Sequence, residues 1–139
     1  MNIKIDYPQP SEIEELYAHF ISGSGHCAIT LDKRDVNAIA LHANKLLSLS
    51  ATGEGEQAIC EAFQSLSSAL KQADISSINR VLIKIVYDDG LSIDDKEMCQ
   101  LDTFMNMFNP ETLFTIGYDE NKLSNKEEVI ICILASMIK

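Results

Sequence analysis

The sequence is short of positive charge. It has 11 Lys and Arg residues against 21 Asp and Glu residues, which gives a formal net charge of -10 at pH 7. A surface of this charge repels phosphate groups on average, so we expect no nucleic-acid partner and no binding to an anionic membrane. The acidic balance mainly predicts a well-solvated surface.

Closely spaced cysteines and long apolar stretches are also missing. The four cysteines lie too far apart for a metal knuckle or a redox motif, which predicts free thiols: Cys27, Cys60, Cys99 and Cys132. The longest apolar stretch, residues 129–138, is about half of the roughly 20 residues that a membrane span needs, which indicates a buried strand. The first residues lack the apolar segment of a secretory signal, so we expect a cytoplasmic protein.

The length is typical of one domain. A chain of 139 residues with 46% hydrophobic content can bury one core and leaves no room for a second domain. Within this one compact unit we distinguish an arm and helix over residues 1–28 from the remainder, residues 29–139.

Four stretches have apolar residues at helical spacing. The most regular is the stripe of Ala58, Ile59, Ala62, Phe63, Leu66 and Leu70. Similar stripes predict helices over residues 13–21, from Asp32 to about residue 46, and from Ser92 to Phe108, before Pro110.

The intervening segments have the composition of strands. Alternation over residues 47–50 and β-branched residues over 81–87 predict two strands, and residues 113–118 and 128–137 predict two more, joined as a hairpin. Ile3 and Ile5 belong to an arm or a short edge strand, and residues 27–31 to a brief extended stretch. The pattern predicts an α/β (α+β) fold with a four-stranded mixed sheet and packed helices.

Several strings follow one another in the order known from one family. Residues 29–36 read Ile-Thr-Leu-Asp-Lys-Arg-Asp-Val, close to the pattern Asn-x-Asp-x-x-Asp-Val, and residues 50–54 read Ser-Ala-Thr-Gly-Glu before a helix rich in alanine. Matching strings continue through residues 81–85, 91–93, 116–119 and 129–135. From about Ile29 to its end, the chain resembles the carboxy-terminal domain of FtsZ, the tubulin-like GTPase of bacterial cell division.

The resemblance does not extend to a nucleotide site. FtsZ binds GTP through an amino-terminal domain with a glycine-rich phosphate loop, whose backbone amides close around the phosphate oxygens. Neither residues 22–25 nor residues 53–55 match a phosphate loop, a dinucleotide fingerprint or the tubulin-type signature. We expect a free-standing domain without the GTPase domain, with no bound cofactor, no metal site and no catalytic residues of its own.

The loop before the second helix carries the candidate interaction residues. In FtsZ the two carboxylates of the matching loop are inserted against the nucleotide of the next subunit. The resemblance places Asp32 and Asp35 at these positions, whereas Thr30 replaces the asparagine. The alternative is local, because Asp32 is a good helix N-cap and Asp35 lies where first-turn amides favour a carboxylate. Both roles are compatible with one loop.

Three functions follow as hypotheses. The first is a non-enzymatic interaction domain that self-associates as a homo-oligomer or docks on an FtsZ-like or tubulin-like partner. The second is a trans-acting modulator of the FtsZ GTPase that uses Asp32 and Asp35. The third is a small ligand-binding or enzymatic α/β domain of unknown substrate, because a fold does not determine a function.

Overall fold

A computed structural model gives the fold of the protein. It describes residues 3–9, 12–20, 26–29, 31–40, 43–55, 57–88, 95–121 and 128–137. Helices and strands alternate along most of the chain, in the order β1 (Ile3–Asp6), α1 (Ile13–Phe20), β2 (His26–Ile29), α2 (Lys33–Ala40), β3 (Lys45–Glu54), α3 (Ala58–Leu70), the 3₁₀ helix η2 (Ile75–Ser77), β4 (Ile78–Asp88), α4 (Asp95–Met105), β5 (Leu113–Asn121) and β6 (Glu128–Met137).

One mixed sheet forms the centre of the molecule. Its six strands, counted over the described residues, have the order β1-β3-β6-β4-β5-β2. Of the strand pairs in the described part of the chain, only β4 and β5 are parallel, and the other neighbours are antiparallel. The predicted fold class is confirmed: the four expected strands are the inner β3, β6, β4 and β5, and two four-residue strands flank them.

The expected hairpin of residues 113–118 and 128–137 is wrong. β6 lies between β3 and β4, and β5 lies on the far side of β4. The reason is burial: every residue of β6 from Ile131 to Met137 is buried, and a central position in a sheet with helices over both faces provides this burial. β5 has several partly exposed side chains and lies nearer the edge of the sheet.

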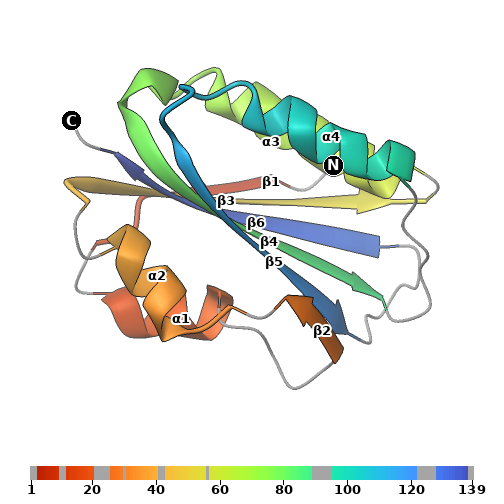
Figure 1. The fold of residues 1–139 in the computed structure, drawn as a ribbon, viewed down its shortest axis with the longest axis horizontal. Helices are drawn as coiled ribbons and strands as arrows, with labels where there is room; N and C mark the ends of the chain where they lie inside the picture. Colours follow the sequence, from red (N-terminus) through yellow and green to blue (C-terminus); the bar gives the residue numbers. More distant parts are fainter. Residues whose placement is uncertain are drawn as a thin grey trace.

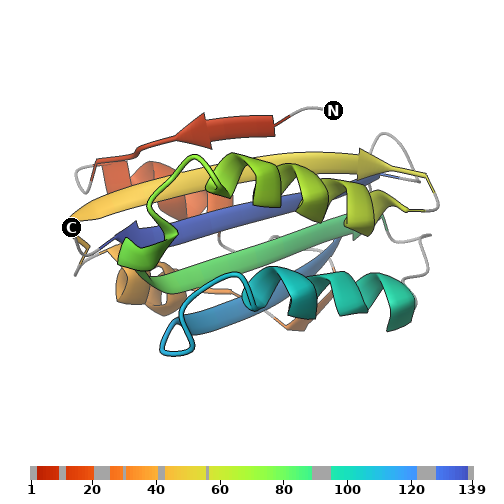
Figure 2. The same cartoon turned by 90° about the horizontal axis from the view of Figure 1, so that it is seen from above.

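Helices cover both faces of the sheet (Figure 1). α3 and α4 lie together on one face, and α1 and α2 lie on the other. The predicted stripe of α3 is buried along its whole length against the sheet, as expected for an amphipathic helix. The view from above shows α3 and α4 in front of the sheet, with β1 at its margin (Figure 2).

The α3/α4 face holds the larger core. Four phenylalanine rings follow one another across it, Phe63, Phe104, Phe108 and Phe114, with centroid separations of 5.1, 5.4 and 5.5 Å. Such tilted and edge-on contacts add to the stabilisation that burial alone provides. At the end of β3 the backbone approaches α3 so closely that a Cβ on Gly53 would lie 1.8 Å from the carbonyl oxygen of Ala58. Only glycine fits there.

The α1/α2 face holds a smaller core with more polar groups. Leu16 and Phe20 of α1 pack with Val36 and Ile39 of α2 over the sheet. The Tyr17 hydroxyl donates a hydrogen bond to Asn37 Oδ1 at 2.5 Å, which joins the two helices. Residues 3–9 and 12–20 thus contribute one edge strand, β1, and part of this core. Within the described residues, no helix has the length and apolar character needed to cross a lipid bilayer.

Candidate functional site

The start of α2 is where the predicted interaction residues lie. Leu31, which is buried, packs in the α1/α2 core, and the chain then leaves the core at the exposed residue Asp32. Leu31 is held close to the sheet because β5 has a glycine beneath it: a Cβ on Gly117 would lie 2.4 Å from Leu31 Cγ. The sheet therefore sets the position of the first turn of α2.

Asp32 and Asp35 form a reciprocal capping box. The backbone amide of Arg34 donates to Asp32 Oδ1 at 2.8 Å, and the backbone amide of Asp32 donates to Asp35 Oδ2 at 2.8 Å. This pattern satisfies amides that the first turn of a helix leaves without a backbone partner. The predicted capping role of both residues is confirmed.

The Asp32 carboxylate is also held in its charged form. Hydrogen bonds from the backbone and side chain of Arg34 lower the pKa of Asp32 below its ordinary value of 3.8. The guanidinium of Arg34 lies 3.3 Å from Asp32 Oδ2. Since the Arg34 side chain is 92% exposed, this ion pair contributes little to stability. The Asp32 side chain is 54% exposed, so this anion is accessible from solvent.

The structure thus brings two of the three predicted residues together. Thr30 lies outside the described residues. Asp32 and Asp35 lie within one helical turn, and both carboxylates accept hydrogen bonds from backbone amides of this turn, Asp32 from Arg34 and Asp35 from Asp32. Contact of these two residues with a partner stays a prediction.

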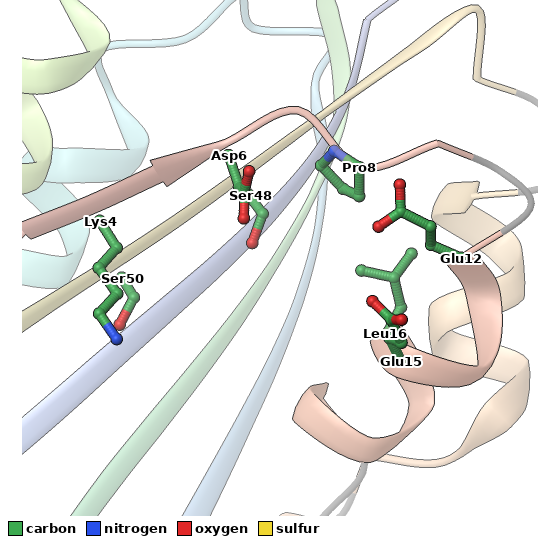
Figure 3. Close-up of a pocket in the computed structure, with 8 residues that line it drawn as sticks. All are labelled: Lys4, Asp6, Pro8, Glu12, Glu15, Leu16, Ser48 and Ser50. Carbon is green, nitrogen blue, oxygen red and sulfur yellow. The ribbon is translucent and has the colours of Figure 1, made fainter.

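A groove next to the sheet edge was not predicted. It has a volume of about 300 Å³ and lies between β1, β3 and α1 (Figure 3). Lys4 and Asp6 of β1 point to the same side as Ser50 and Ser48 of β3, and Glu15 and Leu16 of α1 face them. The lining residues are Lys4, Asp6, Pro8, Glu12, Glu15, Leu16, Ser48 and Ser50.

The alternation of Ile3, Lys4, Ile5 and Asp6 is the sequence signal of this region. It has the period of a strand with one polar side, and it could have identified the polar wall of the groove.

The lining of the groove carries three carboxylates and one ammonium group. Among the described residues, His, Cys, Asp and Glu do not form a group of three that could hold a metal ion.

A row of polar groups crosses the same face of the sheet. Ser50, Cys132 and Lys84 are direct neighbours on β3, β6 and β4, and Lys84 is 7% exposed. Burial raises the pKa of the Cys132 thiol, an effect partly offset by a hydrogen bond with Ser50 and by the charge of Lys84. A buried, protonated thiol is a poor nucleophile. Three cysteines among the described residues are free thiols, as predicted: Cys60, Cys99 and Cys132.

Comparison with known proteins identifies the fold. No protein-family model matches the chain, and no curated protein matches it. Among solved structures, the empty FtsZ dimer of M. jannaschii aligns with a TM-score of 0.60 and 21% identity, over 80% of this chain and 32% of that chain. A mutant form of the same FtsZ aligns with a TM-score of 0.61 and 22% identity, over 91% of this chain and 37% of that chain.

A second group of filament proteins has the same fold. The GTPγS-form protofilament of TubZ from Bacillus thuringiensis serovar israelensis aligns with a TM-score of 0.57 and 9% identity, over 93% of this chain and 34% of that chain. The chain therefore spans about a third of the length of these FtsZ and TubZ chains. Its fold is that of an FtsZ-like carboxy-terminal domain, as the sequence strings predicted.

Proposed function

We propose that this protein is a protein-interaction domain that associates with itself or with an FtsZ-like or TubZ-like filament protein. The supporting observation is the fold. The chain aligns with about one third of the length of chains that were solved as a dimer and as protofilaments. We expect a domain built like part of a filament subunit to share some of the surfaces through which such subunits contact one another. The sequence resemblance to a division GTPase extends the proposal to a role in bacterial cell division.

The exposed apolar side chains support an interaction role. Among the described residues, large hydrophobic side chains are exposed at two places: Leu113 at the start of β5, and Ile3 and Ile5 of β1 together with Tyr7 directly after it. Single exposed apolar residues are ordinary on a protein surface, but a group on one strand is a candidate contact. The acidic charge keeps such a surface soluble and disfavours unselective association.

Co-pelleting with polymerised filaments tests docking. FtsZ of M. jannaschii and TubZ of B. thuringiensis serve as probes, each polymerised with GTPγS and centrifuged with increasing amounts of this protein. We expect the protein to enter the pellet up to a saturating ratio to polymer, and to stay in solution when polymer is absent. An unrelated acidic domain of similar size is the control. A protein that never pellets with either polymer and also sediments as a monomer contradicts the proposal.

A second candidate function is modulation of a partner's GTPase through the first turn of α2. The observation that favours it is the exposed, charged carboxylate of Asp32 at this position. GTP turnover by FtsZ is measured with the wild-type protein, Asp32→Asn and Asp32→Ala. Asparagine still caps a helix but carries no charge, so a change in turnover that Asp32→Asn abolishes shows an action of the charge on the partner. Equal turnover with and without the wild type contradicts this function.

A further inference from the structure

In the part of the chain that the structure describes, the outer edge of β1 has no partner strand. β1 is the first strand in the sheet order, and in the described part of the chain only β3 pairs with it. Figure 2 shows it alone at the margin of the sheet. The exposed backbone groups of such an edge are a template for pairing with another strand. Pro8, which has no amide hydrogen, ends the segment that can pair.

The two sides of β1 have different chemistry. Ile3 and Ile5 pair with Ala51 and Leu49, so they lie on the α3/α4 side of the sheet. Ile5 is 47% exposed and Tyr7 is 46% exposed, so this side of the strand keeps much apolar surface in water. Lys4 and Asp6 lie on the opposite side, where they line the groove. Tyr7 is held at the edge by the Lys45 ammonium, 4.4 Å from its ring centroid.

This alternation makes the edge complementary to itself in one register. Two copies of β1 that pair antiparallel with Ile5 opposite Ile5 place Lys4 of each copy opposite Asp6 of the other. Ile3 then lies opposite Tyr7, so apolar residues meet on one side and opposite charges on the other. Moving the register by two residues in either direction places Lys4 opposite Lys4 or Asp6 opposite Asp6. Like charges directly opposite each other destabilise a strand pair, so charge selects the first register.

We propose that two copies of this chain pair antiparallel along β1 across a two-fold axis at Ile5, which joins their sheets into one. This inference rests on the proposed interaction function and names its partner and surface. A two-fold contact is the commonest way for identical chains to cover such a surface. Strand addition supplies main-chain hydrogen bonds, and the alternating side chains supply specificity.

Charge reversal tests the pairing. Lys4→Glu makes the edge wholly acidic and Asp6→Lys makes it wholly basic, so each variant places like charges opposite each other at two symmetric positions. We expect each to raise the dissociation constant of the dimer about tenfold or more in analytical ultracentrifugation. The double variant Lys4→Glu/Asp6→Lys restores opposite charges and should recover wild-type association. An equimolar mixture of the two single variants should form a heterodimer.

Matched controls separate this pairing from other effects. Lys71→Glu makes the same change in net charge as Lys4→Glu, at an exposed position far along the chain from β1. It should leave the dissociation constant of the dimer unchanged. Circular dichroism of every variant checks that the monomer stays folded. If a single variant is poorly folded, the double variant and the mixture still decide the outcome.

The outcomes separate this inference from the proposed function. Loss in both single variants with recovery in the double variant and the mixture supports pairing along β1. Equal dimerisation of all variants overturns pairing along β1. The proposed function then stands, with self-association through another surface. A wild-type protein that stays monomeric at the highest concentration reached also overturns pairing along β1, and the co-pelleting assay then decides whether docking on a filament partner remains.

Discussion

The two faces of the sheet differ in what they bury. Among the described residues, the buried hydrophobic cluster on the α3/α4 face has about twice as many members as the cluster on the α1/α2 face. On the α1/α2 face a buried lysine, a buried thiol and several serines lie among fewer apolar residues. The difference indicates that one face supplies most of the stability, whereas the other carries the polar groups, the groove and the exposed helix start.

The largest expected effect is on the α3/α4 face. Phe104 is 1% exposed and its ring contacts both Phe63 and Phe108. We expect Phe104→Ala to lower the free energy of unfolding by about 3–5 kcal/mol in urea denaturation, because it leaves a cavity in the middle of the rings. The control Asp102→Ala, at an exposed position of the same helix, should change it by less than about 0.5 kcal/mol.

Phe20→Ala makes the same change on the α1/α2 face. Phe20 is also fully buried, but it lies on an eight-residue helix over a smaller cluster, which can collapse more easily around a cavity. We therefore expect a smaller loss than for Phe104→Ala. If Phe20→Ala lowers the free energy of unfolding as much as Phe104→Ala or more, the α3/α4 face does not supply most of the stability.

The next effect concerns the contact that positions α2. Gly117→Ala places a methyl group in the space of Leu31, and we expect it to lower the free energy of unfolding by about 1–3 kcal/mol. Shortening Leu31 makes room, so Gly117→Ala should be less destabilising in the background of Leu31→Ala. A double-mutant cycle measures this coupling. Additive effects of the two substitutions would contradict the contact.

The capping box gives a smaller effect that depends on pH. We expect Asp32→Ala to lower the melting temperature by a few degrees at pH 7, and Asp32→Asn to lower it less, because asparagine still caps. The pKa of Asp32 is lowered in the folded state, so the charge stabilises the fold above the ordinary pKa of 3.8 and this stabilisation is lost as the pH falls through the folded pKa. The difference between wild type and Asp32→Asn should therefore shrink below about pH 4, as measured by thermal melts.

The smallest effect belongs to the exposed surface away from β1. Leu113 is 61% exposed, so Leu113→Ser should change the free energy of unfolding by less than about 0.5 kcal/mol. It should also leave the dimer dissociation constant unchanged in analytical ultracentrifugation. A clear weakening of the dimer would move the contact from β1 to the start of β5.

The sequence predicted the helices better than the sheet. The apolar stripe of α3 and the start of α2 at Asp32 were read from local spacing, and both are confirmed. The expected hairpin was wrong, because the apolar run of β6 indicates a buried strand but not its neighbours. The capping box could also be predicted, since its hydrogen bonds join residues three positions apart or fewer.

The apolar stripe of α3, the four inner strands and the cap of α2 could be predicted from the sequence, because they depend on interactions within a few residues. The end of α2 could not: the helix expected to reach about residue 46 ends at Ala40, and β3 begins at Lys45. Three features depend on the three-dimensional fold: β6 lies between β3 and β4, Gly117 lies under Leu31, and β1 forms one wall of a groove. Strand pairing joins residues far apart in the chain, and one local pattern is compatible with several neighbours. The choice among them depends on how completely each arrangement buries its apolar side chains.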